Sequence, residues 1–142
     1  MLSKKEQNQI VLAIREAEKK TSGEIRVHIS KLCKGDVLDC AATVFKKLEM
    51  HKTELRNGTL IYVSLKDRHL AIIGDTGINQ VVSDDFWEET LDVMRSFFQQ
   101  KKMVKGICQG IEKVGILLKH YFPYQEGDKN ELPDDVSFDT SE

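Results

Sequence analysis

The chain has 142 residues, a length that suits one domain with a hydrophobic core, and its 40% hydrophobic and 31% charged residues are typical of a globular protein. Its 21 Lys and Arg residues nearly balance 23 Asp and Glu residues, so the net charge of −2 gives no field that favours nucleic acid or an anionic membrane surface. No apolar run reaches the roughly 18 residues of a membrane span, and the polar N-terminus lacks the apolar core of a signal peptide, so we expect a cytoplasmic protein.

The N-terminal part of the chain predicts a helix, a strand and a second helix. A Ser-x-x-Glu capping box precedes apolar residues at helical spacing, so residues 3–20 should form a helix. Residues 24–30 alternate polar and apolar side chains, which is the two-residue period of a strand with one wetter face. Asp36 can cap a helix whose apolar stripe runs through residues 37–48.

The middle of the chain predicts a β-hairpin. The turn signal at residues 56–58 precedes an apolar strand at residues 60–65. A tight reversal at residues 67–68 then returns the chain as a third strand at residues 69–73.

Two further helices follow the hairpin. Ser83 can cap the first, whose apolar face carries Trp87, Leu91, Met94 and Phe98. The second has its apolar stripe between residues 104 and 118 and contains Gly106, Gly110 and Gly115. Each of these glycines costs up to about 1 kcal/mol relative to alanine, so we expect this helix to pack closely against the sheet or the preceding helix.

The order helix-strand-helix-strand-strand-helix-helix predicts an α/β fold, with a small mixed β-sheet of about four strands flanked by helices on both faces. The first two strands are joined by a helix and should be parallel, with a right-handed crossover. The hairpin strands should be antiparallel. We assign residues 1–125 to the folded domain and residues 126–142 to an acidic C-terminal tail, in which residues 136–138 could add a short edge strand.

Polar residues should gather at one edge of this sheet. The predicted topology brings the start of the first strand, the start of the second and the end of the third to the same edge, and the chain then leads to the start of the Trp87 helix. The residues at these places are Glu24, Arg56, Asn57, Asp75, Gly77, Asp84 and Asp85. We therefore expect the functional site at this edge, centred on residues 74–77.

A cluster of carboxylates beside a glycine-containing loop suits a hard divalent cation. Ca²⁺ and Mg²⁺ prefer oxygen ligands, including backbone carbonyls. Gly74 and Gly77 would let the backbone turn sharply and direct its carbonyls inward. Arg56 would either neutralise the carboxylates or hold a phosphate oxygen beside a metal.

Each of these residues also has a purely structural interpretation. Asp84 and Asp85 in the first turn of a helix interact favourably with the helix dipole. Asp75 could form an Asx turn at the end of its strand. Glu24 could be a surface residue opposite Arg26.

Other polar residues give weaker signals. The three cysteines are odd in number and lack CxxC spacing, so neither a disulfide framework nor a zinc site is indicated. Cys40 and Cys108 lie on apolar helix stripes, where buried thiols are common. His28 has no evident partner in the sequence. Residues 128–135 superficially resemble a calcium loop but carry proline where the sixth-position glycine is needed, which leaves room for a weak second cation site only.

Several segments together resemble the TPM-domain family, agreeing with its pattern in order and spacing over roughly residues 5–125. The matching segments are residues 21–27, 56–63 and 73–78, together with Trp87, Gly115 and Tyr121-Phe122-Pro123. The family includes a thylakoid-lumen protein described as an acid phosphatase and members that bind calcium or magnesium at the predicted edge. The resemblance implies a central sheet flanked by helices, with metal and catalytic roles for Glu24, Asp75, Asp84 and Asp85 and support from Arg56 and Asn57.

Many members of this family also carry a signal peptide before the domain and a membrane helix or glycine-rich tail after it. This chain looks like the short stand-alone form, so we do not transfer a thylakoid or envelope role to it.

Two functions are compatible with these residues. The first is a metal-dependent phosphatase that acts through metal-activated water. Its Ca²⁺ or Mg²⁺ would be held by Glu24, Asp75, Gly77, Asp84 and Asp85, and its catalytic residues would be Asp75, Asp85, Arg56 and Asn57. The second is a non-catalytic module that uses a bound cation to stabilise the fold or to dock another protein. The partner besides the cation would then be a phosphorylated small molecule in the first case and a protein in the second.

Overall fold

The computed structural model describes residues 2–127 and 131–139, and it confirms the predicted α/β class and element order. The elements are α1 (Lys4–Glu18), β1 (Glu24–Ser30), α2 (Val37–Lys47), β2 (Gly58–Ser64), β3 (His69–Gly74), α3 (Thr76–Asn79), α4 (Asp84–Gln99), α5 (Met103–Tyr121) and β4 (Ser137–Phe138). The short helix α3 was not expected. No helix among the described residues is long and apolar enough to cross a bilayer.

The four strands form one mixed sheet in the order β3-β2-β1-β4. Strands β1 and β2 are parallel, with Glu24 opposite Gly58, and β2 and β3 are antiparallel, with Thr59 opposite Gly74. Both orientations were predicted. Strand β4 pairs in parallel with the outer edge of β1 through residues 137 and 138, so part of the acidic C-terminal segment belongs to the sheet.

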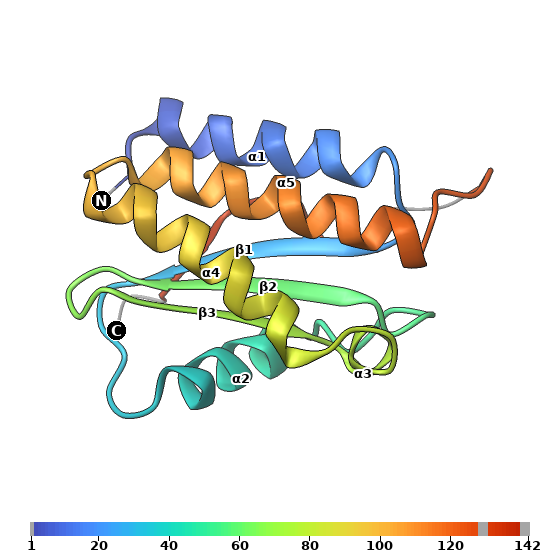
Figure 1. The fold of residues 1–142 in the computed structure, drawn as a ribbon, viewed down its shortest axis with the longest axis horizontal. Helices are drawn as coiled ribbons and strands as arrows, with labels where there is room; N and C mark the ends of the chain where they lie inside the picture. The colour runs from blue at the N-terminus through green and yellow to red at the C-terminus, as the bar shows by residue number, and fades with distance from the viewer. Residues whose placement is uncertain (1, 128–130, 140–142) are drawn as a thin grey trace.

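Helices cover both faces of the sheet, as predicted. Figure 1 shows α1, α5 and α4 side by side above the sheet and α2 beneath it. The core on the three-helix side contains the apolar residues of β1, namely Ile25, Val27 and Ile29, packed with buried residues of α1 and α5. A smaller core lies on the α2 side.

The glycines of α5 allow close helix packing. A Cβ on Gly110 would lie 2.5 Å from Met94 Sδ of α4, and one on Gly106 would lie 2.9 Å from Phe98. A Cβ on Gly115 would lie 2.8 Å from the Cβ of Ala17 in α1. The expected contact with the preceding helix is therefore confirmed at two glycines, and the third serves a contact with α1.

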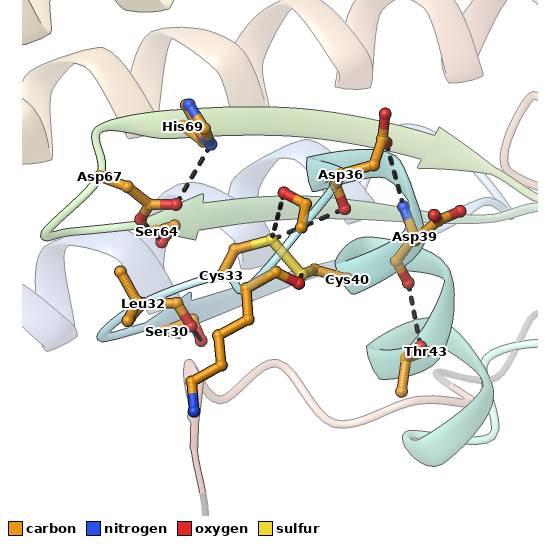
Figure 2. Close-up of a disulfide and its surroundings, with 12 residues drawn as sticks. Ser30, Leu32, Cys33, Asp36, Asp39, Cys40, Thr43, Ser64, Asp67 and His69 are labelled. Carbon is orange, nitrogen blue, oxygen red and sulfur yellow. Dashed lines mark hydrogen bonds and ion pairs between the residues drawn. A yellow bond between two sulfur atoms is a disulfide. The ribbon is translucent and has the colours of Figure 1, made fainter.

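Cys40 is not a free thiol as expected, because it forms a disulfide with Cys33 (Figure 2). The two residues are seven apart in sequence, and their Cα atoms lie 6.1 Å apart across the loop that precedes α2, a separation that suits a disulfide. Gly35, with a φ of +97°, turns this loop back toward the helix. The structure confirms only Cys108 as a thiol, and that residue is half-buried.

Candidate functional site

The sheet edge forms as the topology predicts. The backbone N–H of Glu24 donates to the carbonyl of Asn57 at 3.3 Å, and that of Asp75 donates to Gly58 at 2.9 Å. The N–H of Gly77 donates to the carbonyl of Arg56 at 2.9 Å. Three segments far apart in sequence therefore meet at one rim.

Asp75 is the most firmly held carboxylate at this edge. It caps α3 by accepting the Thr76 N–H at 2.7 Å. Asp75 therefore has the local structural role that the sequence suggested. The guanidinium of Arg56 also binds both carboxylate oxygens, with Nε–Oδ2 at 2.7 Å and Nη2–Oδ1 at 2.9 Å. The Asp75 side chain is only 4% exposed, whereas that of Arg56 is 46% exposed. Hydrogen bonding to Asp75 raises the pKa of Arg56, so the pair is an exposed cation held on a buried anion.

The glycines beside Asp75 serve a different purpose from the one expected. Neither Gly74 nor Gly77 has a positive φ, so neither is needed for a left-handed turn. A Cβ on Gly77 would lie 2.3 Å from the carbonyl oxygen of Leu55 and 2.7 Å from that of Arg56. Gly77 therefore lets the loop that carries Arg56 lie directly against α3, and this contact places the guanidinium over Asp75.

Glu24 is buried and not a surface residue. It is 3% exposed, and its Oε1 accepts the backbone N–H of Leu132 at 2.6 Å. Burial raises the pKa of Glu24 to about 7, against the opposing effect of hydrogen bonds from the backbone of Leu132 and Glu131. The acidic C-terminal segment thus contacts one of the predicted cation ligands directly.

Asn57 brings a buried amide to the same edge. Its Nδ2 donates to the carbonyl of Ser22 at 3.3 Å. Its Oδ1 is buried and has no hydrogen-bond partner among the described residues. An unsatisfied buried carbonyl oxygen costs free energy, and amide oxygens are good ligands for Ca²⁺, so the donor chemistry at this edge fits a hard cation.

The last two predicted cation ligands lie at the start of α4. Asp84 is the first residue of that helix and Asp85 the second, and the Asp85 side chain is exposed. The carboxylates otherwise face different partners: Asp75 binds Arg56 and Glu24 binds the C-terminal segment. Among the side chains that the structure describes, which do not include that of Asp84, no three His, Cys, Asp or Glu groups are arranged to hold a metal ion. The ligand set therefore stays a prediction. Of the calcium-like stretch at 128–135, residues 128–130 lie outside the described residues.

Sequence reasoning missed two carboxylates next to Glu24. Glu18, at the end of α1, accepts the backbone N–H of Ile25 at 2.7 Å through Oε2. Burial, and next the influence of the Asp134 carboxyl group, raises the pKa of Glu18 to about 10. The polar residues of β1 were predicted to form the wetter face of the strand, but they are buried and contact the C-terminal segment. Their alternation with apolar residues is the sequence signal that could have pointed to this region.

His28 also has a partner that the sequence did not reveal. Its ring stacks on Tyr62 with an interplanar angle of 8°, and its nitrogens contact Ser137 Oγ at 2.7 Å and Asp139 Oδ1 at 3.1 Å. Burial lowers the pKa of His28, although Asp139 opposes that shift. These contacts give His28 a structural role.

Comparison with known proteins agrees with this architecture. The sequence profile of the TPM domain matches residues 1–116. The chain is 48% identical to the BA42 protein of the psychrophilic bacterium Bizionia argentinensis, whose NMR structure superposes with a TM-score of 0.91 and covers 98% of this chain and 96% of that one. No curated protein is significantly similar in sequence.

Two more distant structures share the fold. The N-terminal domain of cg2496 from Corynebacterium glutamicum is 15% identical with a TM-score of 0.65, covering 83% of this chain and 74% of that one. The N-terminal domain of a P. gingivalis protein is 17% identical with a TM-score of 0.68, covering 87% and 83%.

Proposed function

Because the chain belongs to the TPM-domain family, we propose that it binds Ca²⁺ or Mg²⁺ at the sheet edge around Asp75 and hydrolyses phosphomonoesters there. The observation that carries the proposal is the presence of two buried oxygen donors in the segments that meet at this edge. One is the Asp75 carboxylate, and the other is the unpartnered Oδ1 of Asn57. Both are ligand types that a hard divalent cation prefers.

The remaining ligands come from the neighbouring segments. Glu24, Asp84 and Asp85 would supply further carboxylates, and the backbone carbonyl of Gly77 would supply another oxygen. A bound cation would polarise a phosphoryl oxygen and lower the pKa of a coordinated water.

Arg56 has a separate role in this proposal. Its guanidinium neutralises Asp75 in the protein alone. Its side chain is 46% exposed, so it can turn outward to bind the phosphoryl oxygens and stabilise the charge that develops on them.

A non-catalytic module is the second candidate. It is favoured by the Arg56–Asp75 pair, which already satisfies the central carboxylate, and by His28, whose ring nitrogens are occupied by the C-terminal segment. In this case the cation would order the edge for contact with a protein partner, and no phosphoester would be cleaved.

Titration with Ca²⁺ and with Mg²⁺, followed by amide NMR, tests the step that both candidates share. We expect the signals of residues 74–77 and of Glu24 and Asp85 to shift first, and Asp75→Asn to weaken the apparent affinity at least tenfold. The control is Asp92→Asn, which alters an exposed carboxylate paired with Arg95 and should leave the affinity unchanged. If the edge signals do not move at millimolar metal, both candidates are wrong.

A phosphatase assay then separates the two candidates. Hydrolysis of p-nitrophenyl phosphate should require the cation and should fall at least tenfold in Asp75→Asn and in Arg56→Met. Cation binding without metal-dependent hydrolysis would establish the non-catalytic module. Hydrolysis that survives Asp75→Asn unchanged would come from another site or a contaminant.

A cytoplasmic location is the remaining part of the proposal. The Cys33–Cys40 disulfide bears on it, because cytoplasmic thiols are normally kept reduced. The redox state of this pair in intact cells therefore tests the location, as described below.

A further inference from the structure

The outer side of β1 contacts residues 135–139 of the C-terminal segment. Ser137 Oγ lies 2.7 Å from His28 Nδ1, and Asp139 accepts a hydrogen bond from Ser30 Oγ at 2.8 Å. The ring of His28 also contacts Asp139, with Nε2–Oδ1 at 3.1 Å. Polar residues of the segment that are two positions apart therefore meet polar residues of β1 that are also two positions apart, as the period of a strand requires.

The other residues of the segment continue this alternation. Val136 and Phe138 are half-buried and pack against the core on the three-helix side. Asp135, two positions before the serine, acts electrostatically on the Arg26 guanidinium. The segment thus presents acidic, apolar, hydroxyl, aromatic and acidic side chains in succession. We call the surface that receives them the β1 docking surface, and it consists of the outer backbone of β1 and the side chains of Arg26, His28 and Ser30.

The charges of the docking surface and of the segment are complementary. Arg26, and Lys47 at the end of α2, lie close enough to act electrostatically on His28. The segment supplies negative charge through Asp135 beside Arg26 and through Asp139 beside His28. An acidic extended peptide is therefore the kind of ligand that matches this surface in both charge and spacing.

The chain's own segment occupies the docking surface incompletely. Its pairing with β1 extends over only residues 137 and 138, which is shorter than a typical strand. The Nε of Arg26 is buried and has no hydrogen-bond partner among the described residues, and an unsatisfied buried donor costs free energy. A pocket of about 30 Å³ also lies beside Phe138. A longer strand with an acceptor that reaches Arg26 would therefore fit this surface better.

We propose that the β1 docking surface binds an extended acidic segment of a partner protein, and that residues 135–139 occupy it as a built-in competitor in the protein alone. The partner segment pairs in parallel with β1 and carries the pattern acidic-apolar-hydroxyl-aromatic-acidic. Its first acidic side chain accepts a hydrogen bond from Arg26 Nε. This inference goes beyond the proposed function and uses neither a cation nor a phosphoester, so its test is read independently of the Ca²⁺ titration and the phosphatase assay.

The test uses the full chain and a fluorescein-labelled peptide with the sequence of residues 131–139, followed by fluorescence polarisation. In the wild type the chain's own segment competes at a high effective concentration, because it is covalently attached. Phe138→Ala removes an apolar contact of that segment, so it should tighten binding of the peptide at least tenfold. Asp139→Ala weakens the segment at its other contacts with β1 and should have the same effect.

Matched variants separate recognition from a general effect of charge. Tyr124→Ala removes an exposed aromatic side chain outside the segment and should leave the peptide as weakly bound as in the wild type. Ser30→Ala, added to Phe138→Ala, should weaken the peptide at least fivefold, because it removes a donor to the last carboxylate. A peptide of the same composition in scrambled order should bind at least tenfold more weakly. A peptide that carries Asp135→Glu should bind at least threefold more tightly, because its longer side chain reaches Arg26 Nε.

Three results would overturn the proposal. One is a peptide affinity that is the same in the wild type, Phe138→Ala and Asp139→Ala. Another is equal binding of the ordered and scrambled peptides, which would show attraction by charge alone. The third is a wild-type dimer in analytical ultracentrifugation that Phe138→Ala abolishes, because it would assign the docking surface to the C-terminal segment of a second copy. An Asp135→Glu peptide that binds no more tightly than the original contradicts the role of Arg26 in selecting the partner.

Discussion

The Asp75 carboxylate accepts hydrogen bonds from a helix N-terminus and from a guanidinium group at the same time. It caps α3 through the Thr76 N–H and it also receives the guanidinium of Arg56. Arg56 adopts a φ of +52° to reach it, a backbone conformation that few residues other than glycine adopt. A left-handed arginine held over a buried aspartate indicates that this contact positions the whole loop before α3.

Asp75→Asn should therefore destabilise the protein even though asparagine is a good helix cap. The substitution removes the charge from a hydrogen bond pair that is buried on one side, and we expect a loss of about 1.5–3 kcal/mol in the free energy of unfolding. Urea unfolding measures it. Asp92→Asn, in an exposed pair with Arg95, should cost less than about 1 kcal/mol. Equal effects of the two substitutions would show that the Asp75 pair contributes no more than a surface pair.

At the scale of elements, α5 is the helix that organises the three-helix layer. It lies between α1 and α4 (Figure 1), and its glycines replace side chains at the points of closest approach. Three glycines in one helix oppose helix formation in isolation. The close packing of neighbouring helices offsets that cost, which is why the glycines were a correct signal of contact.

The Gly115–Ala17 contact provides a test by double-mutant cycle. Gly115→Ala should destabilise the protein by about 1–3 kcal/mol, because the new Cβ would meet the Ala17 Cβ at 2.8 Å and the close packing resists the added volume. In an Ala17→Gly background the same change should be neutral or stabilise by up to about 1 kcal/mol, because only its helix propensity remains. Denaturant unfolding of the four proteins gives the coupling. Additive effects would mean that α1 and α5 separate easily at this point.

At the scale of the whole molecule, the disulfide and the C-terminal residues 131–139 both connect distant parts of the chain to the sheet. The Cys33–Cys40 bond fastens the loop after β1 to the first turn of α2 (Figure 2). The C-terminal segment binds the same region, through the contacts of Asp139 with Ser30 and Lys31. One end of β1 is thus held both by the disulfide at the loop that follows it and by Asp139 of the C-terminal segment.

Replacing both Cys33 and Cys40 by serine should lower the free energy of unfolding by about 2–3 kcal/mol, the loop-closure value for cysteines seven residues apart. Cys108→Ser, at the free thiol, serves as the control and should lack this effect. Alkylation of thiols in intact cells completes the experiment: a reduced pair agrees with the cytoplasm, and an oxidised pair contradicts that location. A double serine variant as stable as the wild type would show that the cross-link does not constrain the unfolded chain.

The sequence by itself determined the order of the elements, the strand directions and the edge at which polar residues meet. These follow from local periodicity and from the handedness of a helical crossover, which act over short stretches of chain. The predicted position of Asp75 beside Arg56 and Asn57 at that edge rests on this reasoning alone. The TPM resemblance rests on the same segments.

Only the tertiary structure decided which partner each polar side chain takes. Glu24 accepts the backbone N–H of Leu132, which is 108 residues away, and His28 contacts Asp139. Cys33 bonds to Cys40 through a turn that no spacing rule identifies. Such contacts depend on where the C-terminal segment folds back, and an acidic stretch with little apolar periodicity carries no local signal for that path. The edge was therefore predictable from the sequence, whereas the C-terminal segment that contacts Glu24 was not.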